Sequence, residues 1–377
     1  MSTSINEGLA LFLGGGGARA AYQAGVLRAF ASARPEFEPQ LLTGVSAGAI
    51  NIAHLANRPG SFAEATETLE DLWRRIEVGR VFEVRTLPLL YHAMCVLSKL
   101  AIGWAPSLDP IRGMVDTAPL AEFLHESYGS SELLRVQENI DRGAVRAVAL
   151  LGLEYATGRT ISFCSGSEFH EWERPLRRAF RTNLRLEHVM ASAALPLFFP
   201  AVDVGGTFYG DGGVRLTAPL ASAVHLGAER LLAISTRYRP TGKEAEIPRF
   251  HGAPSPAQIT GNLFAAMFLD VVDQDALQLE RINSLIAKVP EGERNGLRNV
   301  GLLVIRPSRD LGALANDFEP KLPWMFRFLL RRLGGTNDRS QVLASTVLFQ
   351  DDYLRLLLEI GEEDGHANLD ALDKLMA

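Results

Sequence analysis

The sequence predicts an α/β fold in which a mainly parallel sheet carries helices on both faces. Short apolar runs that suit buried strands alternate along the chain with segments of helical composition. The first two of these runs end in glycine-rich turns that lead directly into a helical segment. The chain has 377 residues, of which 47% are hydrophobic and 22% charged, so it can bury a large core.

The first half of the chain supplies the clearest strands. The run at 9–13 is continuously apolar and suits a buried strand, and residues 20–30 follow with helical composition. A second apolar run at 41–43 leads into a helix over 47–56, which ends before a turn-forming segment. We expect residues 145–155 and 160–164 to pair as strands around the turn Thr157-Gly158.

The second half continues the alternation and then becomes helical. Residue 208 opens a short strand, and a helix over 219–226 and a strand at 231–235 come next. Residues 238–256 are rich in Pro, Gly and charge and predict an exposed loop. The remaining predicted elements are one long amphipathic helix over 258–286, a strand at 300–305, and two helices over 322–333 and 341–360. We expect a main domain over residues 1–310 and a helical extension over 311–377 packed on it.

Composition narrows the class of protein. The net charge of −6 gives no overall basic field, so nucleic acid is not an expected partner. The two cysteines allow at most one disulfide, and residues 1–8 lack the features of a secretory signal, which predicts a cytoplasmic protein. The longest apolar stretch, residues 87–104, contains a proline, a histidine and a lysine. It predicts a buried or interfacial helix rather than a membrane span.

The motif Gly44-Val45-Ser46-Ala47-Gly48 stands between a predicted strand and a helix of small residues. Flanking glycines allow the sharp strand-to-helix turn of a nucleophile elbow, which holds a serine hydroxyl clear of the backbone. Taken alone, the pentapeptide also fits a glycine-rich turn with an incidental serine. The glycine run at 14–17 and the motif at 211–213 favour the elbow.

Four consecutive glycines, residues 14–17, followed by Ala18 and Arg19, stand where the first strand meets the first helix. Backbone amides at such a position favour an anion, which could be a dinucleotide phosphate or the oxyanion of an acyl transfer. A dinucleotide site needs an acidic residue at the end of the second strand, but Glu36 and Glu38 precede that strand. We therefore favour an oxyanion hole over a dinucleotide site or a purely structural turn.

The third motif is Asp211-Gly212-Gly213, which follows an apolar strand. An aspartate before two glycines is commonly a turn former. In a parallel sheet, however, the carboxyl ends of the strands gather at one edge, so Asp211 and Ser46 are expected to meet there.

Together these motifs resemble the patatin-like phospholipases, including bacterial members. The matching pieces are GGGAR followed by AAYQAGVL, the elbow TGVSAGAI, the segment MASAALPLFFP, and DGG, within residues 9–235. The resemblance implies a three-layer α/β/α hydrolase that cleaves acyl esters of phospholipids or neutral lipids with a Ser-Asp dyad. It implies the following roles: Ser46 as nucleophile, Asp211 as base, Gly15, Gly16, Gly17 and Arg19 as oxyanion segment, and Gly44 and Gly48 as elbow glycines. Ala20 departs from the family, which has glycine there, and this departure raises the question of whether the position needs a positive φ.

No cofactor or metal is expected, because no His, Asp or Glu cluster has ligand spacing. Two alternatives remain open. One is a Ser-His-Asp esterase completed by His225, His251 or His366, although none of the eight histidines has an obvious catalytic setting. The other is a non-hydrolytic lipid-binding scaffold, against which the intact Ser46 and Asp211 argue.

Residues 321–333 combine an apolar face carrying Trp and Phe with four cationic side chains. This composition is typical of a helix in a membrane interface and predicts peripheral contact with a lipid surface. The alternative is a C-terminal helix packed on the domain with its arginines in solvent. No feature of the sequence indicates an oligomeric state or a head-group preference.

Overall fold

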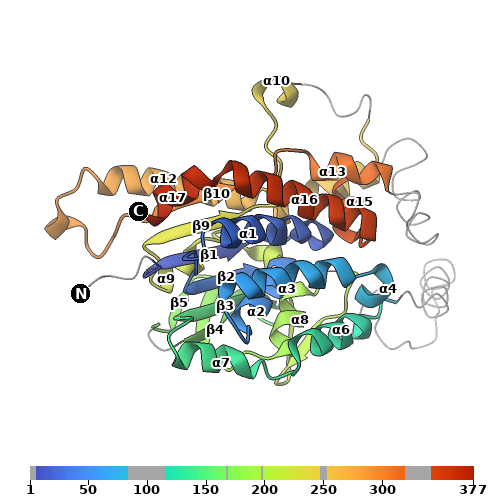
Figure 1. Ribbon diagram of the computed structural model, residues 1–377, viewed down its shortest axis with the longest axis horizontal. Helices are drawn as coiled ribbons and strands as arrows, with labels where there is room; N and C mark the ends of the chain where they lie inside the picture. Colours follow the sequence, from blue (N-terminus) through green and yellow to red (C-terminus); the bar gives the residue numbers. More distant parts are fainter. Residues whose placement is uncertain (1–5, 84–114, 167–168, 197, 247–252, 319–340) are drawn as a thin grey trace, which may run out of the picture.

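A ten-stranded mixed sheet forms the centre of the computed structural model (Figure 1). The structure describes residues 6–83, 115–166, 169–196, 198–246, 253–318 and 341–377. The strands are β1 (Leu9–Leu13), β2 (Leu41–Val45), β3 (Ala147–Glu154), β4 (Arg159–Gly166), β5 (Trp172–Arg174), β6 (Arg177–Arg181), β7 (Val202–Val204), β8 (Thr207–Asp211), β9 (Arg230–Ile234) and β10 (Gly301–Ile305).

The helices of the first half of the chain are η1 (Gly17–Ala20), α1 (Ala21–Ala33), α2 (Ala47–Ala56), α3 (Phe62–Arg75), α4 (Val78–Val81), α6 (Ala118–Tyr128), α7 (Leu134–Asp141) and α8 (Leu186–Ala193). The later helices are η2 (Gly212–Arg215), α9 (Ala221–His225), α10 (Gly242–Ala245), α11 (Pro256–Phe268), α12 (Val271–Ile286), η3 (Glu291–Glu293), α13 (Leu311–Leu314), η4 (Ala315–Asp317), α15 (Gln341–Val347), α16 (Asp351–Ala367) and α17 (Leu369–Met376).

The strand order is β10-β9-β1-β2-β3-β4-β6-β5, with β8 added to β3 and β7 to β8. The first five strands of this order pair in parallel, whereas β4 runs antiparallel to β3. The predicted α/β fold with a mainly parallel sheet is therefore confirmed, and so is the predicted hairpin of β3 and β4.

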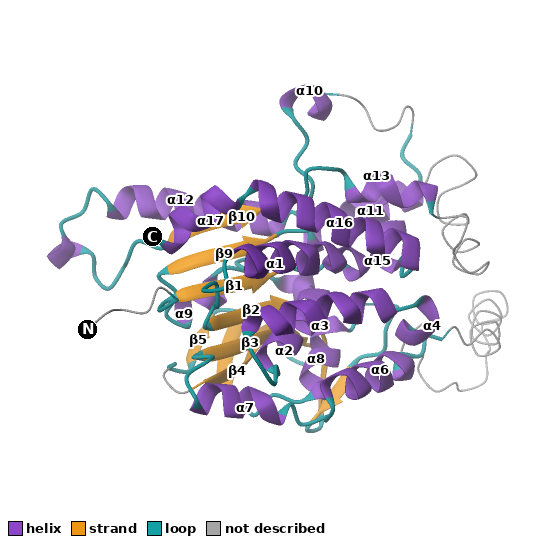
Figure 2. Cartoon of the chain, in the orientation of Figure 1, coloured by secondary structure: helices purple, strands orange, loops and turns teal. Residues whose placement is uncertain are grey.

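Alternate side chains of β1 face two different helical layers, as the period of a strand requires. Leu9, Leu11 and Leu13 belong to a core cluster shared with α1, α2, α3 and α16. Ala10 and Phe12 belong to a second cluster shared with α9 and α12. The sheet thus lies between two layers of helices (Figure 2), which confirms the three-layer α/β/α architecture.

Helix α16 lies along α1, and glycines let the two backbones approach closely (Figure 1). A Cβ on Gly25 would lie 2.1 Å from the carbonyl oxygen of Leu358, and a Cβ on Gly361 would lie 2.2 Å from that of Tyr22. The Tyr22 hydroxyl also donates to Asp364 at 3.0 Å. Helix α16 therefore shares the core of the N-terminal strand β1, while the domain boundary at residue 310 stays a prediction.

Two predicted long helices are wrong, because each is broken where its apolar face changes partner. The segment 258–286 forms α11 and α12, and Phe264 and Phe268 pack in one cluster whereas Val272 and Ala276 pack beneath the sheet. One straight helix could not reach both clusters. The segment 341–360 likewise divides into α15, which contacts η1, and α16, which contacts α1.

The other predicted elements are confirmed, with small changes at their ends. The helix expected over 20–30 begins as the 3₁₀ turn η1 and continues to Ala33, and the expected loop 238–256 contains the single turn α10. The predicted helices over 87–104 and 322–333 lie outside the described residues. None of the helices in the described ranges is long and apolar enough to cross a bilayer.

We expect Gly25→Ala to destabilise the protein by about 1–3 kcal/mol, because its Cβ would collide with the backbone of α16. Gly79→Ala is the matched control, since a Cβ on this helical glycine would meet nothing within 4 Å. That change should leave stability unchanged or raise it by up to about 1 kcal/mol. Urea unfolding of the two variants measures the difference, and equal midpoints would contradict the close packing of α1 and α16.

Candidate active site

Ser46 occupies the turn between β2 and α2. Its backbone angles are φ 57° and ψ −132°, a conformation that side-chain-bearing residues rarely adopt and that costs on the order of 1–3 kcal/mol. The flanking glycines leave no room for side chains. A Cβ on Gly44 would lie 2.6 Å from the carbonyl oxygen of Gly48, and a Cβ on Gly48 would lie 2.2 Å from that of Leu13. This is the strand–turn–helix geometry expected of a nucleophile elbow.

The Ser46 backbone is held by a residue for which the sequence analysis proposed no role. The Ser46 amide donates to the hydroxyl of Ser192 on α8 at 3.1 Å, and that hydroxyl donates to the carbonyl oxygen of Leu151 at 2.5 Å. Ser192 is fully buried. It lies in the MASAALPLFFP segment, so the family resemblance was the signal that could have singled it out.

Asp211 meets Ser46, but not in the way expected. We predicted that the two residues follow strands that point in the same direction. In the structure, β2 pairs with β3 in parallel as far as Val45 opposite Leu151, and β8 pairs with β3 antiparallel with Asp211 opposite Gly152. The two strands therefore approach each other end to end along one edge of β3, and their carboxyl ends meet.

The Asp211 carboxyl is completely buried. Its Oδ1 accepts the Gly213 amide at 2.8 Å, and its Oδ2 is buried without a hydrogen-bond partner of regular geometry. Burial raises the pKa of Asp211 to about 7, and this rise is opposed in part by the Ser46 hydroxyl and the Gly213 amide. Near neutral pH this carboxyl can therefore both accept and release a proton.

The glycine loop, residues 14–17, passes next to Ser46. A Cβ on Gly15 would lie 2.9 Å from the Cβ of Ser46. Gly16 and Gly17 have φ values of 151° and 57°, and a Cβ on Gly17 would lie 2.1 Å from the carbonyl oxygen of Thr346 on α15. The first amides of the 3₁₀ turn that follows have no acceptor within the helix. The loop thus brings backbone donors close to the serine, and a side chain at Gly15, Gly16 or Gly17 would collide with its neighbours.

The glycine loop is fixed by contacts that sequence motifs did not predict. The Thr236 hydroxyl donates to the carbonyl oxygen of Gly15 at 2.8 Å. Arg19 has a different place from the one expected, because its amide donates to the carbonyl oxygen of Gly16 at 3.2 Å. Its buried guanidinium donates through Nε to the Ser345 hydroxyl at 2.8 Å. The Arg19 side chain therefore connects the loop to α15, while its amide is hydrogen-bonded within the turn.

Ala20 does not distort the loop. Its φ of −69° and ψ of −11° are helical, so the position needs no residue tolerant of positive φ. The Ala20 side chain is fully buried, and its carbonyl oxygen accepts a hydrogen bond from Asn51. The substitution of alanine for the family glycine is accommodated in the ordinary helical conformation.

An apolar cavity, here called the Ser46 cavity, opens beside the serine. Its walls come from several elements, including α2, α3, α6 and α15, and include Ile50, Trp73, Ile76, Leu120, Phe199 and Phe349. Thr346 and Val347 of α15 add to the lining next to Gly17. A cavity of this composition suits a hydrocarbon chain.

The described histidines that we considered have other surroundings. His54 contacts Thr68, and burial lowers its pKa to about 4. His188 accepts the Arg185 amide, His225 stacks on Trp172, and His366 lies 3.9 Å from Glu362. His251 lies outside the described residues. Within the described part of the chain, no group of three or more His, Cys, Asp or Glu residues is arranged to hold a metal ion.

Comparison with known proteins gives one match at the level of the sequence family. The model of the family described as Patatin-like phospholipase matches residues 11–224, a span that includes Ser46 and Asp211. Thr236 and α15 lie beyond this span. A search of curated proteins found no match.

Several solved structures are similar at low identity. Human GIVD cytosolic phospholipase A2 is 11% identical over 98% of this chain and 59% of that chain, with a TM-score of 0.48. VipD from Legionella pneumophila is 12% identical over 93% of this chain and 66% of that chain, with a TM-score of 0.34. ExoU from the type III secretion system of Pseudomonas aeruginosa, in complex with SpcU, is 14% identical over 90% and 74%, with a TM-score of 0.31. The chain therefore spans less than two thirds of the human chain.

The buried Asp211 predicts a pH-dependent stability. Since the pKa of Asp211 is about 7 in the folded protein against its ordinary value of 3.8, the folded state binds one more proton than the unfolded chain between these two pH values. Stability from this group is therefore full below pH 3.8 and is lost as the pH rises through 7. The Asp211→Asn side chain cannot ionise. From pH 5 to pH 8, the free energy of unfolding of this variant should therefore rise relative to that of the parent by on the order of 2 kcal/mol.

Urea unfolding of parent and Asp211→Asn at the two pH values measures this gain. The comparison cancels the titration of all groups that the two proteins share. A difference in stability that is the same at both pH values would mean that Asp211 titrates near its ordinary value.

Proposed function

Because the chain belongs to the patatin-like phospholipase family, we propose that it hydrolyses carboxylic esters of lipids with Ser46 as nucleophile and Asp211 as general base. The family match confirms the resemblance carried by the sequence motifs. One observation carries the proposal furthest, namely that a serine in a strained turn lies beside a fully buried carboxyl whose pKa is about 7. A base of this kind takes up a proton near neutral pH without a histidine.

In the first half of the reaction, Asp211 takes the proton of the Ser46 hydroxyl while the serine oxygen attacks the ester carbonyl carbon. Negative charge then develops on the carbonyl oxygen. The protonated Asp211 donates its proton to the leaving alcohol, and the acyl group stays on Ser46 as an ester. In the second half, Asp211 takes a proton from water as the water attacks this ester, and then returns it to Ser46.

We assign the oxyanion to the amides of Gly15, Gly16 and Gly17. The close approach of Gly15 to Ser46 and the positive φ values of the next two glycines support this assignment. The Arg19 amide is left out, because it donates to Gly16 within the turn. Amides that are already in position require no reorganisation when the charge appears, which makes them effective in stabilising it.

The substrate class follows from the Ser46 cavity. Its apolar walls fit the acyl chain of a phospholipid or neutral lipid, and none of the described residues that line it is charged. Contact with a membrane surface through residues 321–333 stays a prediction, because that segment lies outside the described residues.

The two alternative functions have less support. A Ser-His-Asp esterase would need a histidine next to Ser46, and the described histidines that we considered have other partners. A non-hydrolytic scaffold would not need a strained serine beside a buried carboxyl, since both features reduce stability without any structural benefit.

The reacting pair is tested by Ser46→Ala and Asp211→Asn. Each should lower esterase activity at least about 1,000-fold while the protein stays folded, because the nucleophile or its base is missing. A fluorophosphonate should label the parent on Ser46, as shown by mass spectrometry of the labelled peptide, and should not label Ser46→Ala. Single replacements of His54, His188, His225, His251 and His366 are the controls and should keep most of the activity.

A loss of about 1,000-fold in any folded histidine variant would contradict the dyad and favour a triad. An unlabelled parent without activity on phospholipid, lysophospholipid, acylglycerol and p-nitrophenyl esters would favour the scaffold.

The oxyanion assignment is tested in the glycine loop. Gly16→Val should lower kcat by about 100-fold or more, because its Cβ would lie 2.6 Å from the Thr236 hydroxyl and displace the amides. Gly14→Ala is the matched control, since its Cβ would make only ordinary contacts at 3.7 Å. Steady-state kinetics with a p-nitrophenyl ester measures both, and parental kcat in Gly16→Val would rule out this loop as the oxyanion hole.

A further inference from the structure

Three buried polar side chains link the Ser46 cavity to the glycine loop through an unbroken series of hydrogen bonds. Trp73 of α3 donates through Nε1 to Oδ1 of Asn51 on α2 at 2.8 Å. Asn51 donates through Nδ2 to Oε1 of Gln23 on α1 at 3.0 Å and to the carbonyl oxygen of Ala20 at 3.1 Å. Gln23 donates through Nε2 to the carbonyl oxygens of Gly14 at 2.9 Å and Ile234 at 3.1 Å.

Each of these three side chains is buried and has a partner for each of its hydrogen-bonding groups. Gln23 and Asn51 are 0% exposed and Trp73 is 1% exposed. Both N–H bonds of each amide and the single N–H of the indole have acceptors, and both amide oxygens have donors. Since an unsatisfied buried amide is costly, such a network strongly prefers one arrangement. It is therefore suited to hold a neighbouring backbone in place.

The backbone that it holds is the glycine loop. Gly14 stands immediately before the three glycines to which we assign the oxyanion, and Ala20 ends the turn that follows them. Gln23 binds the carbonyl oxygen of Gly14 and Asn51 binds that of Ala20. The two ends of the loop are therefore held by two side chains that also bind each other. The hydrogen bond from Gln23 to the carbonyl oxygen of Ile234, at the end of β9, connects the same pair of side chains to the sheet.

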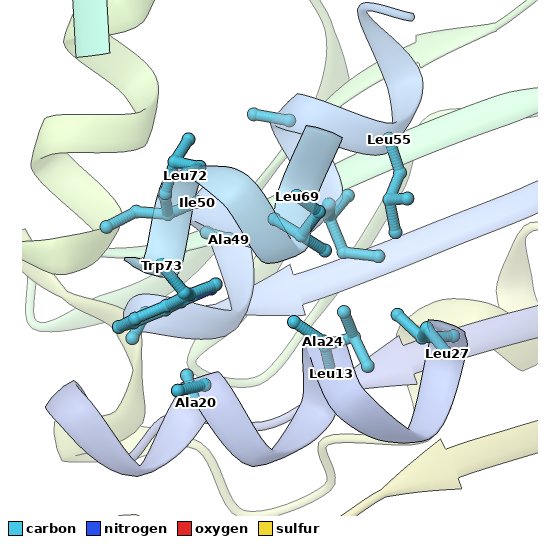
Figure 3. Close-up of a cluster of buried hydrophobic side chains, with 14 of the residues drawn as sticks. Leu13, Ala20, Ala24, Leu27, Ala49, Ile50, Leu55, Leu69, Leu72 and Trp73 are labelled. Atoms are coloured by element: carbon cyan, nitrogen blue, oxygen red, sulfur yellow. The ribbon is translucent and has the colours of Figure 1, made fainter. Parts of the chain in front are cut away.

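Trp73, at the other end of the series of hydrogen bonds, lies at the Ser46 cavity. The Trp73 side chain lines the Ser46 cavity together with Ser46 itself. Figure 3 shows its ring among Ala20, Ala49 and Ile50, between the start of α1 and the elbow helix α2. An acyl chain in this cavity would pack against the ring whose N–H orients Asn51.

We propose that Gln23 and Asn51 are positioning residues for the glycine loop, and that Trp73 makes their positioning depend on the acyl chain in the Ser46 cavity. The inference rests on the proposed esterase function and deepens it. A chain that fills the cavity packs against the Trp73 ring and adds to the contacts that hold Asn51 and the loop in this arrangement. Binding energy from a remote part of the substrate is thereby used at the reacting carbonyl, which raises kcat and not only affinity.

The test compares p-nitrophenyl acetate with p-nitrophenyl octanoate. In the parent, the octanoate should have the higher kcat. Trp73→Phe keeps an aromatic wall in the cavity but deletes the N–H that binds Asn51. In this variant the KM for the octanoate should stay below the KM for the acetate, as in the parent. The kcat for the octanoate should fall close to the kcat for the acetate. Gln23→Met keeps the size of the side chain but deletes both donors. It should lower kcat by about 100-fold for both esters at nearly unchanged KM.

Asn139→Leu is the matched control for stability. Asn139 is 2% exposed, and its Nδ2 donates to the carbonyl oxygens of Ala56 and Arg58 at the end of α2 that lies away from Ser46. Its replacement also removes two buried hydrogen bonds and should lower the melting temperature, but it should leave kcat and the ratio of the two esters at parental values. Trp73→Phe is the milder of the two test variants and carries the test if Gln23→Met does not fold.

The possible outcomes separate this inference from the function on which it rests. A parent that hydrolyses neither ester and is not labelled on Ser46 would overturn both. An active parent, with parental kcat and parental chain-length preference in Trp73→Phe, would overturn the positioning role alone. A loss of kcat in Asn139→Leu equal to that in Gln23→Met would also overturn it, because both would then reflect general destabilisation.

Discussion

The arrangement on which the site depends is the shared edge of β3. β2 occupies this edge as far as Leu151, and β8 occupies it from Gly152 onward in the opposite direction. The junction is tightly filled, because a Cβ on Gly212 would lie 2.4 Å from the carbonyl oxygen of Leu151. The same oxygen accepts the Ser192 hydroxyl that binds the Ser46 amide. Two segments about 165 residues apart in the chain, 46 and 211, are thus fixed against one peptide unit.

Local signals in the sequence predicted the parts of the site that are local in the chain. Glycines around Ser46 and the run at 14–17 indicate sharp turns, and the structure has turns at both places. The antiparallel approach of Asp211 could not be predicted, because strand pairing between distant segments leaves no periodic trace. The break between α11 and α12 was missed because both sides of it are apolar, and only the position of two separate clusters explains it. Buried amides such as Gln23 and Asn51 are also invisible in a pattern, since polar residues in a helix usually indicate its solvent face.

Several features of the site reduce the stability of the fold. Ser46 has an unfavourable backbone conformation, Asp211 is a carboxyl removed from water, and the glycine loop has more freedom in the unfolded chain than other residues would. The surrounding core offsets these costs. Side chains of β1 are completely buried on both faces of the sheet, and α1 is enclosed between the sheet and α16. A site of this kind requires a rigid frame, because each of its unfavourable conformations would otherwise relax.

The hydrogen bond between Arg19 and Ser345 joins an early part of the sequence to a late one, so it cannot form until both have been synthesised. The two residues are separated by 326 positions, and Gly17 and the Thr346 carbonyl that faces it are similarly far apart in the chain. During translation, the glycine loop and Ser46 therefore leave the ribosome well before α15 does. The nascent chain therefore carries every motif of the site long before it can assemble the loop around them. Contacts of such long range also slow folding, and the glycine loop has its complete set of contacts only when α15 has docked on it.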